Sequence, residues 1–270
     1  MIRFLTAKDH ELIRQAKQLW KECFFDSDEF IKYYFSQRSS PCNVLCNIKD
    51  GVLVSMLHAI PHNFSANGDM HSAILVAGVC TKEPYRGKGY AAELLDHLHE
   101  NVKHDAFLLQ TASADMFKFY EKFGYETLCT YYALTVENTL MRKTRQTLPD
   151  FALLANIHSC FVRNFDSDFC GSVAYIENAM AECKTGASFL AYTDKAFALC
   201  SENDGTCEVM YVIGEYSDEL KERICEQTDC RTVKILLSQA VAGAEPTPFN
   251  MIKTDIDLAE AGKILTNLYY

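Results

Sequence analysis

The spacing of apolar residues predicts a regular succession of strands and helices in the first half of the chain. Asp50-Gly51 and Asn67-Gly68 are strong signals for hairpin turns between these strands. These two turns favour three consecutive antiparallel strands. The strands would follow a pair of helices and precede a helix–strand–helix–strand series. The predicted elements are a strand over 2–6, helices over 11–23 and 28–37, strands over 44–48, 52–60 and 73–80, a helix over 91–102, a strand over 107–110, a short helix at Tyr120 and a strand over 126–136.

The second half repeats this order, with Asn203-Asp204-Gly205 as a further hairpin turn. We therefore predict two domains of related fold, over 1–138 and 150–270, joined by a connection. The alternative is that the second half is an unrelated α/β unit. The predicted elements are helices over 151–164 and 171–185, strands over 188–192, 196–201 and 207–213, a helix over 218–226, a strand over 231–237, a loop over 242–248 and a last strand around 251–255.

The segment Arg86-Gly87-Lys88-Gly89-Tyr90-Ala91 lies between the apolar strand 73–80 and the helix that follows. A glycine-containing turn that leads into a helix N-terminus presents unpaired amides to an anion, and glycine lets a phosphate come close to the backbone. The spacing is not Gly-x-Gly-x-x-Gly, and no Gly-Lys-Ser/Thr ends the turn, which excludes a dinucleotide fingerprint and a P-loop. This turn is therefore predicted to bind a phosphate-bearing cofactor. The corresponding turn of the second half, 214–219, lacks arginine and is acidic, so it is predicted not to bind pyrophosphate.

About thirty residues later comes Phe119-Tyr120-Glu121-Lys122-Phe123-Gly124-Tyr125, a short helix that ends in a glycine. Together with the turn at Arg86, this segment resembles the GNAT superfamily of N-acetyltransferases over residues 1–136. The resemblance implies an α/β (α+β) fold with mixed sheets flanked by helices, acetyl-CoA as co-substrate and no metal. The tandem arrangement is similar to the enhanced intracellular survival acetyltransferases, with a degenerate second domain and without their sterol-carrier-like domain.

The resemblance also implies roles for individual residues. Tyr120 would protonate the leaving thiolate as general acid, because a phenol is protonated at neutral pH. The base is left open between the carboxylate of Tyr270, His58, His62 and a carboxylate acting through water. Cys80 is interpreted as a packing residue, not a nucleophile, because it lies on a buried strand. The implied cofactor-binding residues are Val79, Cys80 and Thr81 for the pantetheine arm, and Arg86, Gly87, Lys88, Gly89, Tyr90, Ala91 and Ala92 for the pyrophosphate.

Aromatic and acidic residues alternate between the two early helices, a composition suited to binding an organic cation. An amphipathic helix with an acidic cap would show the same pattern. The net charge of −10 disfavours a nucleic-acid partner and is compatible with a cationic substrate. The predicted partner is a small cationic amine or a polyamine. The predicted acceptor-binding residues are Phe24, Asp26, Asp28, Tyr33 and His58.

The twelve cysteines are scattered through apolar runs, which indicates reduced, buried thiols and not a disulfide framework. Cys42 and Cys46 with His58 and His62 imitate a zinc finger only loosely, because the histidines fall on a predicted strand. No apolar run is long enough to span a membrane and the N-terminus does not resemble a signal peptide, so a cytoplasmic protein is expected. A homo-oligomer is left open. The alternative function is a non-catalytic acyl-CoA-binding or regulatory module, for which Tyr120 would have no use.

Overall fold

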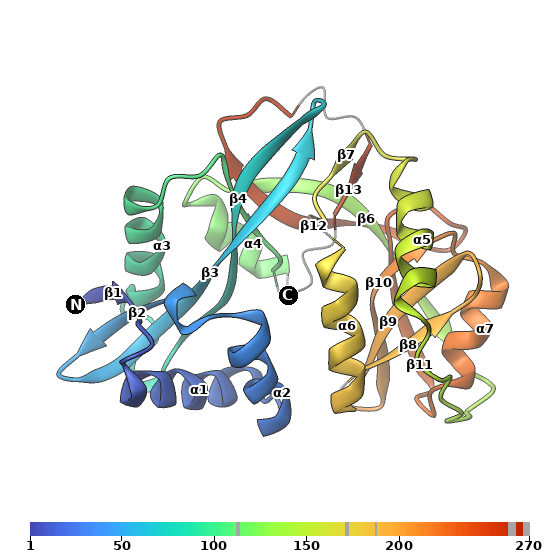
Figure 1. The fold of residues 1–270 in the computed structure, drawn as a ribbon, viewed down its shortest axis with the longest axis horizontal. Helices are drawn as coiled ribbons and strands as arrows, with labels where there is room; N and C mark the ends of the chain where they lie inside the picture. Colours follow the sequence, from blue (N-terminus) through green and yellow to red (C-terminus); the bar gives the residue numbers. More distant parts are fainter. Residues whose placement is uncertain (112–113, 171–172, 187, 259–262, 267–270) are drawn as a thin grey trace.

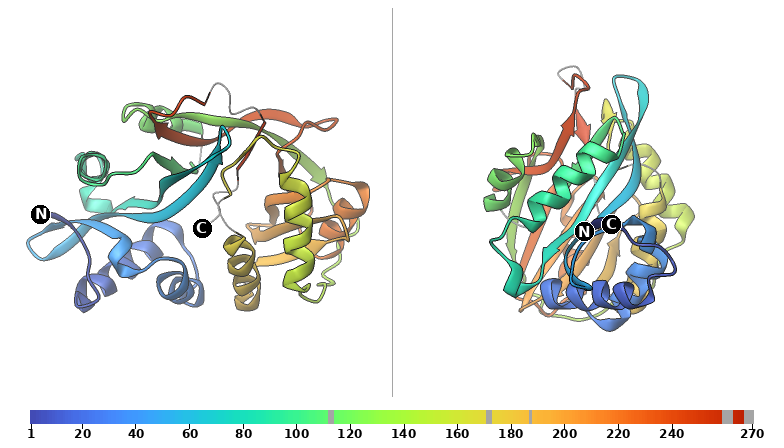
Figure 2. Two further views of the ribbon diagram at one scale, coloured as in Figure 1. Left: turned by 45° about the horizontal axis from the view of Figure 1, so that its top comes forward. Right: turned by 90° about the vertical axis from the view of Figure 1, so that its left-hand side faces the viewer.

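One twisted, mixed sheet runs through the molecule and carries helices on both faces (Figure 1, Figure 2). The computed structural model describes residues 1–270 apart from 112–113, 171–172, 187, 259–262 and 267–270. Among the described residues the strands follow the order β1-β2-β3-β4-β5-β12-β6-β11-β10-β9-β8, and β7 and β13 form a small addition beside β3. The α/β class predicted from the sequence is confirmed.

The elements appear in the predicted order along the chain. The first half contains β1 (Ile2–Phe4), α1 (His10–Phe24), α2 (Asp28–Tyr33), η1 (Tyr34–Arg38), η2 (Pro41–Asn43), β2 (Val44–Lys49), β3 (Val52–Ala66), β4 (Asp69–Thr81), η3 (Glu83–Tyr85), α3 (Tyr90–Asn101), β5 (Ala106–Leu109), α4 (Ala114–Glu121) and β6 (Glu126–Glu137). The second half contains α5 (Phe151–Val162), β7 (Ser167–Asp168), α6 (Ala174–Thr185), β8 (Ser188–Tyr192), β9 (Ala196–Asn203), β10 (Thr206–Gly214), α7 (Asp218–Glu226), β11 (Thr232–Leu237), β12 (Glu245–Thr254) and β13 (Ile264–Leu265).

The predicted hairpin turns are confirmed by their backbone angles. Asp50 and Gly51 have φ of 51° and 78°, both in the left-handed region that a tight two-residue hairpin requires. Asn67 and Gly68 join β3 to β4 in the same way, with φ of 55° and 84°. The turn between β9 and β10 repeats the pattern.

The loop predicted over 242–248 is wrong in its second part, because β12 begins at Glu245 and includes Pro246 and Pro248. Proline cannot donate to a sheet ladder, so it is tolerated where one edge of a strand is free. This part of β12 pairs only with β6, and pairing with β5 begins at Met251. The two prolines therefore mark a strand segment with a single neighbour.

The two halves exchange strands. β12 comes from the second half but lies between β5 and β6, with Met251 opposite Leu109 on one side and Thr127 on the other. β6 in turn pairs with β11 of the second half, and Figure 1 shows β6 and β12 crossing between the two groups of helices. The division into domains at 138–150 stays a prediction, since the sheet itself is continuous.

Separate hydrophobic clusters lie on the two faces of the sheet. In the first half, α1 and α2 cover one face of β2–β4, and α3 and α4 cover the other. In the second half, α5 and α6 cover one face and α7 the other. The hydroxyl of Tyr33 in α2 donates to the main-chain oxygen of Asn178 in α6 at 3.1 Å, which joins the two halves. No described helix has both the length and the apolar character needed to cross a membrane.

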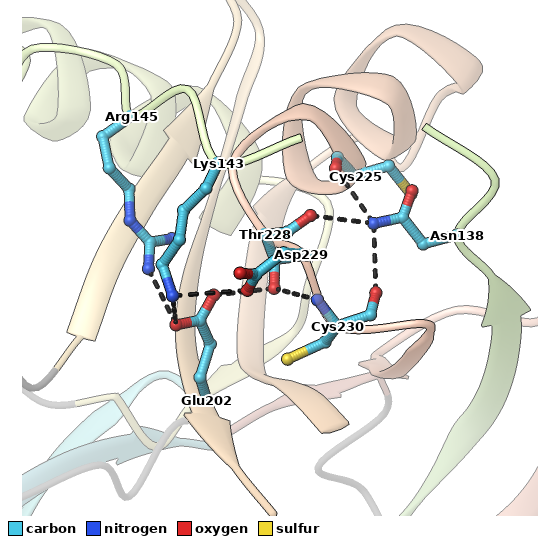
Figure 3. A network of polar contacts seen from close by, with 8 residues as sticks. All are labelled: Asn138, Lys143, Arg145, Glu202, Cys225, Thr228, Asp229 and Cys230. Carbon is cyan, nitrogen blue, oxygen red and sulfur yellow. Dashed lines mark hydrogen bonds and ion pairs between the residues drawn. The ribbon is translucent and has the colours of Figure 1, made fainter. Parts of the chain in front are cut away.

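The connection between the halves is held by polar contacts (Figure 3). The side-chain amide of the buried Asn138 donates to the main-chain oxygens of Cys225, Thr228 and Cys230 at 3.0–3.1 Å. Farther along, Lys143 and Arg145 both pair with Glu202, at 2.9 and 3.1 Å. The connection is thus fixed against α7 and β9 and is not a free linker.

Candidate active site

β4 has an open edge over its last residues. It runs parallel to β5 only from Ala73 to Leu75, although the strand continues to Thr81. On its other side, pairing with β3 extends as far as Thr81. Among the described residues, the backbone from residue 76 onward has no strand partner on the β5 side, so an extended ligand could add there as a further strand. Val79, Cys80 and Thr81, the residues predicted to bind pantetheine, lie on this open edge.

A β-bulge interrupts β4 within this edge. Met56 lies opposite Cys80 and His58 opposite Ala77, so Gly78 and Val79 together face one residue of β3. Gly78 has φ of 55°, and a Cβ built on it would lie 2.4 Å from the Trp20 ring. Only glycine therefore fits. A bulge takes its extra residue out of the ladder, which leaves an amide that β3 does not use.

The predicted anion-binding turn lies directly after this strand. Gly87 and Gly89 have φ of 73° and 83°, and a Cβ built on either would meet no atom within 4 Å. α3 begins at Tyr90 without a side-chain cap, and its first main-chain bond runs from the Glu93 amide to the Gly89 oxygen at 3.0 Å. The amides of residues 90–92 thus point out of the helix end, as an anion site requires.

The two cationic side chains of the turn make different contacts. Arg86 folds back toward β4, where its Nε donates to the Thr81 oxygen at 3.0 Å. Lys88 donates to the Pro84 oxygen at 2.9 Å and covers the Tyr85 ring. Both side chains are exposed, so the turn carries positive charge next to the open helix end.

Tyr120 lies on α4, on the face of the sheet that also carries α3. Its side chain is only 6% exposed and shares a cluster with Val79 and Leu94. The main-chain oxygen of Tyr120 accepts from the Phe123 amide at 2.9 Å, and Gly124 turns the chain with φ of 81°. The glycine-ended helix predicted from the sequence therefore packs Tyr120 beside the open edge of β4. Its role as acid stays a prediction.

Three of the five predicted acceptor-binding residues gather around Trp20. The indole Nε1 donates to Asp26 at 2.7 Å, and the Trp20 ring contacts those of Phe24 and His58 at 4.7 and 5.2 Å. Burial raises the pKa of Asp26, and the hydrogen bond from Trp20 opposes this rise. Trp20 itself was not predicted, although it is the only tryptophan in the chain and lies on the apolar face of α1.

The other two predicted acceptor-binding residues point elsewhere. Asp28 is exposed and pairs with Lys21 at 2.7 Å. Tyr33 is directed toward α6, as described above. The structure therefore brings Phe24, Asp26 and His58 together around Trp20 and places Asp28 and Tyr33 outside this group.

The histidines proposed as bases are both enclosed. His58 is fully buried, its Nδ1 lies 2.7 Å from the Ser39 hydroxyl, and burial lowers its pKa to about 3. Burial also lowers the pKa of His62, whose Nε2 bonds to the Phe169 oxygen at 3.1 Å. Tyr270, the third candidate, lies outside the described residues. Neither histidine presents a strong base to the edge of β4.

One group of metal-ligating side chains occurs among the described residues, and it lies in the second half. It consists of Glu202, Asp229 and Cys230 (Figure 3). Lys143 and Arg145 already neutralise Glu202, so the charges present there do not favour a cation. Cys42 and His58, part of the zinc-finger imitation, lie on separate elements, one exposed and one buried.

A cavity of about 550 Å³ lies apart from the turn at Arg86. It is lined by the middle of β6, the segment after β11 and the start of β13, including Thr130, Gln239 and Lys263. None of the predicted site residues that the structure describes lines it. The candidate site is therefore defined by the open edge and the turn, not by this cavity.

Comparison with known proteins agrees with this geometry. Residues 2–128 match the family model of the acetyltransferase (GNAT) domain. No curated protein matches the sequence.

Solved structures of low sequence identity share the fold over nearly the whole chain. Eis1 from Mycobacterium abscessus has a TM-score of 0.53 at 12% identity, covering 94% of this chain and 73% of its own. A putative acetyltransferase from Pyrococcus horikoshii has 0.58 at 16%, covering 98% and 94%. Saccharomyces cerevisiae N-myristoyltransferase, solved with myristoyl-CoA, has 0.61 at 9%, covering 98% and 84%. The open edge of β4 and the glycine turn both lie within residues 2–128, the part of the chain that matches the family model of the acetyltransferase (GNAT) domain.

Proposed function

We propose that the protein transfers an acetyl group from acetyl-CoA to a primary amine of a small cationic molecule or polyamine. One observation carries the proposal: the edge of β4 that has no described strand partner is followed, after the short helix η3, by a glycine turn with an open helix N-terminus. An extended pantetheine arm needs main-chain partners, and a pyrophosphate needs convergent amides. Here the two are consecutive in the chain, as one continuous ligand would require.

Different groups of the chain would then assist different steps of the reaction. Acetyl-CoA supplies the acyl group as a thioester. An amide released at the Gly78–Val79 bulge would donate to the carbonyl oxygen as charge develops on it, which is often the largest single contribution to such catalysis. Tyr120 would donate a proton to the departing sulfur.

The acceptor amine would bind on the α1 side of β4. An ammonium group is attracted by ring faces and by a half-buried carboxylate, and Trp20, Phe24 and Asp26 supply these. The amine must lose a proton before it attacks. A histidine with a pKa of about 3, such as His58, is a weak base for this step. We therefore favour a carboxylate acting through water, and Asp26 is the one that these contacts offer.

The cofactor site is tested by closing the turn. Gly89→Val should abolish CoA binding in calorimetry, because a side chain would fill the space that faces the helix end. Gly68→Val is the matched control: its φ of 84° and open surroundings equal those of Gly89, but it lies in the β3–β4 hairpin. Both variants carry the same backbone strain. Normal CoA affinity in Gly89→Val would refute the site.

Catalysis is tested separately, by release of the CoA thiol from acetyl-CoA with a panel of amines. Tyr120→Phe should lower turnover by about 10²–10⁴-fold and leave CoA affinity nearly unchanged. A variant that keeps more than about a third of the wild-type rate would assign Tyr120 a packing role. CoA binding without turnover on any amine would favour the non-catalytic acyl-CoA-binding module.

A further inference from the structure

Two thiols and a guanidinium meet at the end of β4. Cys23, in the last turn of α1, has its sulfur 3.7 Å from Nη2 of Arg86 and 3.9 Å from the Thr81 oxygen. Cys23 also packs against the buried cluster that contains Cys80, and its interaction with the Cys80 thiol is the largest cause of its lowered pKa. The acetyl transfer proposed above uses neither thiol. The group nevertheless lies where the open edge passes into the glycine turn.

The two thiols differ in the properties that decide reactivity. The interaction with Cys80, followed by Arg86, lowers the pKa of Cys23 to about 6, so this thiol is largely ionised at neutral pH. Cys23 is only partly buried, and a small oxidant can reach it. Cys80 is buried, and burial raises its pKa, so it stays protonated. An accessible thiolate beside a second, protonated thiol is the usual arrangement of a redox-sensitive cysteine pair.

We propose that Cys23 is an oxidation site for hydrogen peroxide and that Cys80 resolves it to a disulfide. The Cys23 thiolate attacks one peroxide oxygen, forming an S–O bond, while the O–O bond breaks and hydroxide leaves. The sulfur of Cys80 then attacks the resulting sulfenic acid. An S–S bond forms, and the sulfenic oxygen leaves as water with the Cys80 proton. The two sulfurs lose two electrons in total, and peroxide gains them.

Oxidation would act on the cofactor site through Arg86 and Cys80. A disulfide has an S–S bond of about 2 Å, much shorter than any contact between two unbonded sulfurs, so the end of α1 must move closer to β4. The thiolate beside Arg86 disappears at the same time. Because Cys80 contributes main chain to the open edge, we expect the oxidised protein to bind CoA at least about tenfold more weakly. This consequence rests on the proposed function, whereas the oxidation itself does not.

The oxidation is tested without any cofactor. The full-length protein is treated with limiting hydrogen peroxide, and peptide mapping should link Cys23 to Cys80. Cys80→Ala should trap a sulfenic acid on Cys23 that dimedone captures, and Cys23→Ser should form neither product. The alkylation rate of Cys23 should rise with an inflection near pH 6. Exposed Cys42 and Cys160 serve as internal controls. Faster oxidation of either control than of Cys23 would overturn the proposal.

The effect on the cofactor site is tested by calorimetry with CoA. The reduced wild type should bind, the oxidised wild type should bind more weakly, and dithiothreitol should restore binding. Cys23→Ser should bind equally before and after peroxide. Equal binding by a wild type whose disulfide has been verified would refute the regulatory effect. If the reduced protein does not bind CoA at all, the proposed function fails while the cysteine pair stands on its own evidence.

Discussion

His58 is a titratable residue placed among aromatic rings. Trp20, Tyr34 and Phe35 surround its imidazole at ring-centre distances of 5.2–5.3 Å. Its Nδ1 pairs with Ser39, whereas its Nε2 has no partner among the described residues. Desolvation disfavours the charged imidazolium, which is why the pKa is low. The neutral imidazole of His58 therefore packs like an apolar ring beside the β4 bulge.

The stability of the fold should therefore depend on His58 at mildly acidic pH. The unfolded imidazole titrates near pH 6.5, but in the folded chain it stays neutral down to about pH 3. The unfolded state thus binds an extra proton in this window, and stability falls as pH decreases through it. Between pH 7 and 5.5, His58 should account for a loss of about 1 kcal/mol.

Urea unfolding at both pH values measures this loss. His58→Asn should show a smaller loss than the wild type, whatever its stability at pH 7, because it lacks the titrating group. His104→Asn, at an exposed histidine, is the control and should keep the wild-type loss. An unchanged pH dependence in His58→Asn would contradict the low pKa.

At the scale of elements, the end of α4 depends on a residue far away in the sequence. Lys253 of β12 donates from its Nζ to the main-chain oxygen of Phe123 at 2.6 Å, just after α4. Its stem also packs against Gly124. A cation at a helix C-terminus satisfies a free carbonyl and complements the helix dipole. The second half therefore helps to hold the helix that carries Tyr120.

Lys253→Met keeps the stem and removes the donor, so its effect isolates this contact. Unfolding free energy should fall by about 1–2 kcal/mol, the lower part of the range for bonds from charged groups, because Lys253 is partly exposed. Turnover should fall with it, while CoA affinity should stay near that of the wild type. Lys234→Met, an exposed lysine on β11, is the matched control. Wild-type stability in Lys253→Met would show that the contact contributes nothing.

The local elements could be predicted from the sequence, but not all of the contacts between them. Hairpin turns such as Asp50-Gly51 were predictable because few residues adopt positive φ without cost. The contact of Trp20 with Asp26 was not, since it depends on Phe25, which adopts φ of 60° after α1 and reverses the chain. The contact between Lys253 and the end of α4 could not be predicted either. The alternation of residues along a strand does not indicate which other elements lie beside that strand.

At the scale of the molecule, the strand exchange means that the first half of the chain cannot form its complete sheet without the second half. Residues 1–138 contain the whole candidate cofactor site, yet lack the strand between β5 and β6. Without the second half, β5 would have one unpaired edge and β6 would have two, because β11 and β12 are both missing, and part of the α3–α4 core would lose Met251. We therefore expect the fragment 1–138 to unfold without cooperativity or to aggregate.

A fused chain should repair this defect. Glu245 lies opposite Ala133, so about eight Gly/Ser residues after Asn138 are long enough to bring residues 245–255 back along β6 as a hairpin. The fusion should unfold cooperatively in urea and bind CoA. The same fusion with residues 245–255 in scrambled order is its control. Cooperative unfolding of the unfused fragment would mean that β12 is dispensable.

The position of β12 late in the sequence also determines when the sheet can be completed during protein synthesis. Its partners in β5 and β6 leave the ribosome more than a hundred residues before it does. At about 5–20 residues per second, the edges of β5 and β6 that β12 will cover stay unpaired for on the order of ten seconds. During this interval chaperones, or other nascent chains, can pair with them. The strand that closes the sheet between β5 and β6 is therefore translated long after the two strands that it joins.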